Sequence, residues 1–131
     1  MNIAKQLPEP LKSFVVDVPA NQYNDFELEP GSTYPLSGVT YPVDYGYIPG
    51  YTAEDGHELD LFVGSQPDCE MGYVLVYRGE NTPDEHKFYI GLTSEDVQEV
   101  ISQLKPVLIK NEKIADITTL LGVIEHYKDK S

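Results

Sequence analysis

The stretch Glu54–Gly64 reads EDGHELDLFVG, and it joins an acidic turn directly to an apolar strand. Four of its first seven residues are carboxylates, with a glycine and a histidine among them. Leu59–Val63 is apolar except at Asp60, which predicts a strand covered on both faces. The acidic part has two interpretations: a solvated charged turn, or converging carboxylates that bind a metal.

Further strands are predicted on both sides of this stretch, at Phe14–Val18, Tyr73–Tyr77 and Lys87–Ile90. Residues 19–58 are rich in Pro, Gly, Asn and Tyr, which predicts mostly turns and short extended pieces. Short strands joined by long loops favour a small barrel over a flat sheet.

Two helices are predicted near the end of the sequence. Thr93–Asp96 has a capping-box pattern, apolar residues follow at helical spacing, and Pro106 ends the helix. A second helix should run from about Asp116, a plausible N-cap, to about Lys128, and its spacing turns Tyr127 and Lys128 toward the barrel. Strands followed by helices define the α+β class.

Composition limits the function. The chain has 131 residues, which predicts a single domain over residues 1–131, and its net charge is -13. Such a charge disfavours binding to nucleic acid or to membranes, and an anionic substrate would need divalent cations as a bridge. The lone Cys69 excludes an internal disulfide and, with no signal-like apolar segment at the start, favours a cytoplasmic protein.

Two acidic groups are candidates for a metal site. Asp55 and Asp60 flank a glycine turn, whereas Glu80, Asp84 and Glu85 lie between the next two strands. Because strands that are neighbours in sequence often pair, both groups should meet at one end of the barrel. Converging carboxylates suit hard cations such as Mg²⁺, although acidic loops on so acidic a chain are also typical of solvated turns.

The order of motifs resembles that of the soluble, Mg²⁺-dependent inorganic pyrophosphatases. The motifs are VVDVPAN (15–21), FEL (26–28), YPVDYGYI (41–48), EDGHELDLFVG (54–64), ENTPDEHK (80–87) and EHYKD (125–129). The resemblance implies an OB-like five-stranded β-barrel with two C-terminal helices, metal-dependent hydrolysis of diphosphate, and a homo-oligomer.

The resemblance also implies roles for individual residues. Metal ligands would be Asp55, Asp60, Glu80 and Glu85, with Asp17 and Glu27 around them. Residues that hold phosphate would be Tyr45, Lys87, Tyr127 and Lys128, and the catalytic positions would be His57 and Asp60.

Three departures from the family pattern weaken this assignment. His57 replaces an aspartate that helps to activate water, and two family cations are missing, a lysine before Glu27 and an arginine before Tyr41. Arg78, the only arginine, cannot be aligned with the missing one, although it could fold near the site. Two lost charge-assisted hydrogen bonds cost about 3–6 kcal/mol, a factor on the order of 10² to 10⁴ in binding or rate.

His57 itself has two interpretations. A neutral imidazole accepts protons near neutral pH and binds Mn²⁺, Zn²⁺ or Co²⁺ better than Mg²⁺, which predicts hydrolysis with a transition-metal preference. Alternatively, His57 is a solvent-facing turn residue in a retired site, or Glu58 supplies the missing carboxylate after a small loop shift.

The sequence therefore predicts a slow, divergent pyrophosphatase that uses Mg²⁺, or Mn²⁺, Zn²⁺ or Co²⁺ given His57, and reaches diphosphate through the metal. The alternative is a non-catalytic pyrophosphatase-like module that binds a phosphorylated metabolite, a metal or a protein partner. A third hypothesis is a structural barrel that acts through oligomer contacts.

Overall fold

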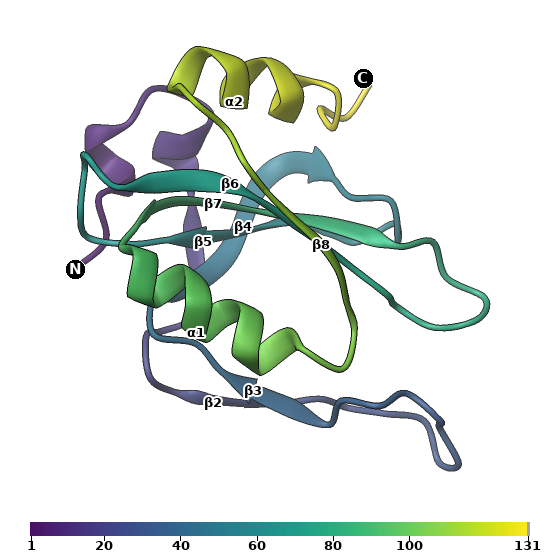
Figure 1. The fold of residues 1–131 in the computed structure, drawn as a ribbon. Coiled ribbons are helices and arrows are strands. Elements are labelled where there is room, and N and C mark those ends of the chain that lie inside the picture. The colour runs from purple at the N-terminus through teal and green to yellow at the C-terminus, as the bar shows by residue number, and fades with distance from the viewer. Residues whose placement is uncertain (131) are drawn as a thin grey trace.

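Strands form most of the core of the computed structural model, which describes residues 1–130 (Figure 1). The elements, in chain order, are 3-10 helices η1 (Ala4–Gln6) and η2 (Leu11–Ser13), β1 (Val15–Val18), β2 (Tyr23–Asp25), β3 (Gly38–Thr40), β4 (Asp44–Thr52), β5 (Glu58–Val63), β6 (Glu70–Val76), β7 (Glu85–Leu92), α1 (Ser94–Leu104), β8 (Leu108–Lys113) and α2 (Ile117–Glu125). The α+β class predicted from the sequence is confirmed.

Six of these strands make one sheet in the order β1-β4-β5-β7-β6-β8, and β2 and β3 pair separately. The pairings are antiparallel except between β5 and β7, which run parallel. Over the described chain this sheet is open, with β1 and β8 at its edges, so the expected five-stranded OB-like barrel is not confirmed. Two strands of this sheet, β4 and β8, were not predicted from the sequence pattern.

The sheet is covered on both faces (Figure 1). One face packs against α1 and the β2–β3 hairpin, in a core that includes Val39, Phe62 and Val100. The opposite face packs against α2 and the N-terminal segment, in a core that includes Leu11, Phe88 and Ile124. Alternate residues of the central strands therefore belong to different cores, as the period of two in a strand requires.

Both helix starts agree with the prediction. Thr93 caps α1, and its hydroxyl accepts a hydrogen bond from the Asp96 amide while the Asp96 carboxylate accepts one from the Thr93 amide. The Asp116 side chain caps α2 by accepting from the Thr119 amide at 2.8 Å. Such caps satisfy the free amides of a first helical turn. Within residues 1–130, no helix has both the length and the apolar character needed to cross a membrane.

Candidate active site

The parallel pairing of β5 and β7 assembles the site. Leu61 lies opposite Phe88, so the first residues of both strands lie at the same end of the sheet and bring Asp60 and Glu85 together. The prediction that the two acidic segments converge is supported, but the expected reason was wrong: β5 pairs with β7, while β6 lies on the far side of β7. A parallel pair places like ends together, which an antiparallel neighbour would not do.

A buried lysine joins the two strands on the α1 face. Lys87 Nζ lies 2.9 Å from Asp60 Oδ2 and donates to the Tyr45 hydroxyl at 2.7 Å. The Tyr45 hydroxyl in turn donates to the same Asp60 oxygen at 2.6 Å. Since Lys87 is only 5% exposed, this closed triangle satisfies a charge that would otherwise be costly to bury. Asp60 Oδ2 accepts both of these hydrogen bonds, and Asp60 lines the cavity described below.

Glu85 is more deeply buried, at 1% exposure, and lies between two cations. Its Oε1 is 3.1 Å from Lys87 Nζ and 3.4 Å from Arg78 Nε, and Arg78 Nε is also 3.7 Å from Asp55 Oδ2. Despite these short charge contacts, neither Glu85 oxygen nor Arg78 Nε has a hydrogen bond of ordinary geometry. The carboxylate is thus attracted by charge but not held by directed bonds.

Burial and neighbouring charge shift the pKa values of the two acids in opposite directions. Burial raises the pKa of Glu85 to about 7, because the opposing effect of Lys87 is smaller and Asp60 and Asp55 add repulsion. Burial also acts to raise the pKa of Asp60, but Lys87 and the Tyr45 hydroxyl outweigh it, and that pKa lies below its ordinary value. The negative charge of the pair therefore resides first on Asp60.

Asp60, Lys87, Tyr45 and Arg78 line a cavity of about 500 Å³ beneath the β2–β3 hairpin, and Glu85 lies buried behind them. Carboxylates line it from three stretches of the chain: Asp17, Asp25, Glu27, Glu29, Asp55, Glu58 and Asp60. Its only strong cations are Arg78 and Lys87, and Tyr34, Tyr41 and Tyr45 form an aromatic wall. An anion can enter so negative a cavity only when additional positive charge accompanies it.

The turn at the start of β5 carries His57 to the mouth of this cavity. The His57 amide donates to Asp55 Oδ1 at 3.1 Å, and the Ala53 amide donates to the His57 carbonyl at 2.8 Å. Gly56 has a φ of 85°, a conformation that glycine adopts without strain. The His57 side chain is exposed and lines the cavity, as do the exposed Asp17 and Glu27.

The structure does not bring every predicted residue to this cavity. Glu80 is exposed and lines a separate cavity of about 390 Å³, next to the residues 29–34. The Tyr127 hydroxyl donates to Glu54 Oε2 at 3.1 Å on the α2 face, where His86 Nδ1 also contacts Glu54. Lys128 is exposed beyond α2 and pairs through its backbone with Tyr51.

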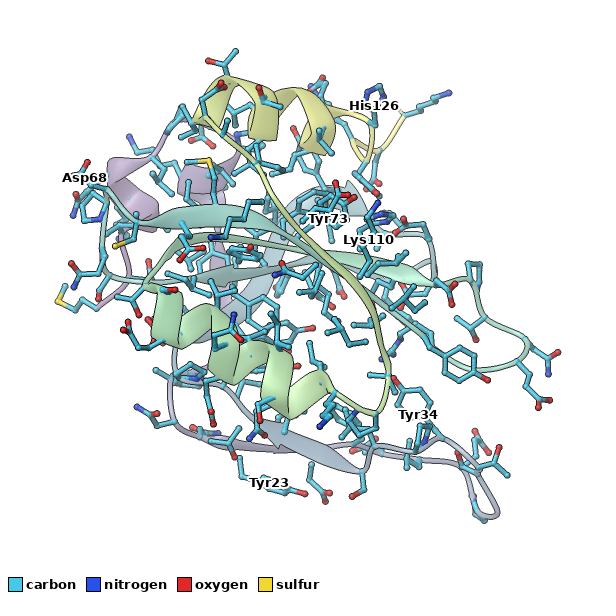
Figure 2. All side chains as sticks on the ribbon, viewed as in Figure 1. Tyr23, Tyr34, Asp68, Tyr73, Lys110 and His126 are labelled. Atoms are coloured by element: carbon cyan, nitrogen blue, oxygen red, sulfur yellow. The ribbon has the colours of Figure 1, made fainter. Side chains whose placement is uncertain are left out.

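The helix-spacing argument was right for Tyr127, which packs against the core on that side, and wrong for Lys128, which is exposed because α2 ends at Glu125. It could not decide which face of the sheet α2 covers. Figure 2 shows this division of the faces, with Tyr34 on the hairpin side and Tyr73 and His126 on the α2 side.

Two residues at the site were not assigned by sequence reasoning. Arg78 comes from the loop after β6, and its guanidinium carbon lies 5.8 Å from the centre of the Tyr34 ring. The Tyr34 hydroxyl donates to the Tyr77 carbonyl at 2.8 Å, which ties the hairpin loop to the β6–β7 loop. The available signal was Arg78 itself, the single arginine in a chain of net charge -13.

The residues present fit a hard divalent cation in their chemistry. Asp55, Asp60 and Glu85 offer carboxylate oxygens, and both oxygens of the buried Glu85 lack a hydrogen bond. Basic side chains lie among these oxygens, and within residues 1–130 no three acidic, histidine or cysteine side chains are gathered closely enough to hold a metal unaided.

Comparison with known proteins agrees with this chemistry. The family model described as Inorganic Pyrophosphatase matches residues 15–105. A relative named inorganic pyrophosphatase from Aeropyrum pernix is 25% identical over 134 residues, covering 88% of this chain and 71% of the relative. Another inorganic pyrophosphatase, from Synechocystis sp., is 32% identical over 74 residues, covering 52% of this chain and 44% of the relative. No solved structure matches significantly.

An α+β protein with carboxylates and a buried lysine around one acidic cavity is typical of metal-assisted phosphate chemistry. The chain belongs to the inorganic pyrophosphatase family. It spans less than half of the Synechocystis relative.

Proposed function

We propose that the protein is a slow, divergent inorganic pyrophosphatase that hydrolyses diphosphate to two phosphates with a divalent metal. The single observation that supports this most is the Asp60–Lys87–Tyr45 triangle at the base of the acidic cavity. It combines an ionised carboxylate with a buried cation, one to bind metal and one to bind phosphate oxygen.

The residues of the site have different roles in this proposal. Asp55, Asp60 and Glu85 would hold the metal, which when bound would polarise the phosphoanhydride and offset the charge of the cavity. Lys87 would donate hydrogen bonds to the phosphate oxygens, and the Tyr45 hydroxyl would do so by giving up its bond to Asp60 once Asp60 holds the metal. Arg78, the only other strong cation on the cavity wall, would replace one of the two family cations that are missing.

That replacement changes the expected rate. Only one charge-assisted contact is then lost, at about 1.5–3 kcal/mol, which corresponds to a factor on the order of 10 to 100.

His57 would receive a proton from the attacking water. Its exposed imidazole lines the cavity beside the proposed metal ligands, and its backbone is fixed by the turn that contains Gly56. In a second role, which excludes the first, the imidazole would bind the metal; because it is a poor ligand for Mg²⁺ and a good one for Mn²⁺, Zn²⁺ and Co²⁺, we propose a preference for a transition metal. Glu80, expected as a metal ligand, and Tyr127 and Lys128, expected to hold phosphate, are given no role in this proposal, because they do not line the cavity.

We further propose that the whole chain is one domain, that it works in the cytoplasm, and that it forms homo-oligomers. We also propose that it binds neither nucleic acid nor membranes. The net charge of -13 supports this last proposal, since both surfaces are polyanions.

Phosphate release from diphosphate tests the function directly. Wild type, Asp60→Asn and His57→Asp should be assayed with Mg²⁺, Mn²⁺ and Zn²⁺, and folding should be checked by circular dichroism. We expect turnover in wild type that is highest with Mn²⁺ or Zn²⁺ and about 100-fold lower or absent in Asp60→Asn. His57→Asp should shift the preference toward Mg²⁺.

Other outcomes separate the alternatives. Turnover that appears only in His57→Asp would indicate a retired site. No turnover in any variant, together with measurable binding of metal or phosphate, would support the non-catalytic module instead.

A further inference from the structure

Arg78 holds a position that a second cation could also hold. Its Nε lies 3.7 Å from Asp55 Oδ2 and 3.4 Å from Glu85 Oε1, and these carboxylate side chains are only 3% and 1% exposed. The two acids come from different segments: Asp55 lies in the turn before β5, and Glu85 is the first residue of β7. The guanidinium therefore links two buried carboxylates that are the proposed metal ligands.

We propose that Arg78 and a divalent cation compete for the Asp55 and Glu85 carboxylates, and that metal binding releases the guanidinium into the cavity as an anion-binding group. The competition rests on the contacts of Arg78, and only the identity of the anion rests on the proposed pyrophosphatase function.

The contacts of Arg78 suit an exchangeable bond. Neither its Nε nor either Glu85 oxygen makes a hydrogen bond of ordinary geometry, so the pair lacks the directed, two-point contact that makes arginine–carboxylate pairs strong. Its side chain is 32% exposed, whereas that of Lys87 is 6% exposed and is fixed by Tyr45 and Asp60. Arg78 can move without opening the core, and Lys87 cannot.

The surroundings offer the released guanidinium another place. The Tyr34 ring already lies 5.8 Å from the guanidinium carbon, and this cation–π contact can remain when Arg78 leaves the carboxylates. Arg78 lines the main cavity and also the neighbouring cavity next to Glu29 and Gly31, so both openings are within its reach. A divalent ion between the carboxylates would repel the guanidinium and favour this outward position.

The consequence is a coupling between metal and anion. Without metal the only exposed cation of the cavity is neutralised by Asp55 and Glu85, and with metal it is available to an anion. By thermodynamic reciprocity the anion must then also strengthen metal binding. Arg78 would thus make anion binding depend on metal.

A single resonance reports on this exchange, because the chain has one arginine. In full-length protein labelled with ¹⁵N, the Arg78 Nε–Hε cross-peak should be followed during titration with Mg²⁺ and with Zn²⁺, both diamagnetic. We expect it to move toward the position of free arginine as the backbone amides of Asp55 and Glu85 report metal binding. A cross-peak that stays in place while those amides saturate, or the absence of metal binding, would overturn the proposal.

A matched pair of variants gives a second readout. Calorimetric titration with the same metals should show binding on the order of tenfold tighter for Arg78→Gln than for wild type. Lys110→Gln removes the same charge from an exposed site outside the cavity and should change affinity little. Equal affinities for the two variants would contradict direct competition. Neither experiment measures turnover, so an inactive protein could pass both, and an active one could fail both.

Discussion

Glu85 is a carboxyl group that is almost fully buried among charged neighbours. It is buried at the start of β7, between the cations Arg78 and Lys87, and close to the acids Asp60 and Asp55 that repel its charge. Burial raises its pKa from 4.5 to about 7. The folded, metal-free protein therefore keeps a proton that the unfolded chain releases, and this difference makes stability depend on pH.

The sign of that dependence follows from the raised pKa. Between pH 4.5 and 7 the unfolded state has lost the Glu85 proton and the folded state has not, so the free energy of unfolding should fall as pH rises. The loss should be on the order of 2–4 kcal/mol and should be absent in Glu85→Gln. Urea unfolding in EDTA at pH 5, 6, 7 and 8 measures it. Parallel pH profiles for the two proteins would contradict the assignment.

Two tyrosines allow a comparison of roles at the same residue type. Tyr45→Phe removes a hydroxyl bonded to Asp60 and Lys87 in the cavity, and Tyr127→Phe removes one bonded to Glu54 on the opposite face. We expect Tyr45→Phe to weaken binding of a diphosphate analogue about tenfold. Tyr127→Phe should lower the free energy of unfolding by about 1 kcal/mol with little change in binding. Calorimetry measures binding and urea unfolding measures stability. A larger loss of binding in Tyr127→Phe than in Tyr45→Phe would contradict this account and support the expected contact of Tyr127 with phosphate.

At the scale of elements, the sequence predicted those strands and helices that have a clear apolar pattern or capping motif. The strand at Leu59–Val63, the capping box at Thr93 and the cap at Asp116 all occur. Two strands were missed. β4 contains Gly46, Pro49 and Gly50, which read as turn residues although it is nine residues long. β8 is an edge strand of mixed polarity, whose pattern carries no strong period.

The glycine of the YGYI stretch has a structural reason. A Cβ at Gly46 would lie 1.8 Å from the Val15 carbonyl oxygen of β1, so the strands could not keep their spacing. Gly46→Ala should lower the free energy of unfolding by about 2 kcal/mol or more and displace Asp17 from the cavity. Gly122→Ala is a matched control, because a Cβ there meets nothing within 4 Å and alanine favours the helix. Thermal unfolding compares them, and equal stability would contradict the packing.

At the scale of the whole molecule, the parallel pairing of β5 with β7 determines the site. The resemblance of the motifs to the pyrophosphatase family pointed to Asp55, Asp60, Glu85, Lys87 and Tyr45, all of which meet there. It could not identify Arg78 as a partner of Asp55, since that contact depends on how the β6–β7 loop folds. Nor could it show that α2 covers the opposite face. Both features depend on which distant segments pair, and local patterns in a single sequence do not reveal that pairing.

The central claim is that diphosphate and a divalent metal bind together in the cavity beside Lys87. Calorimetric titration of imidodiphosphate, a non-hydrolysable analogue, tests it in EDTA and in Mg²⁺, Mn²⁺ or Zn²⁺, with wild type and Lys87→Met. We expect binding by wild type only when metal is present, and on the order of 100-fold weaker binding by folded Lys87→Met. Binding in EDTA as tight as with metal, or binding by Lys87→Met as tight as by wild type, would contradict the account.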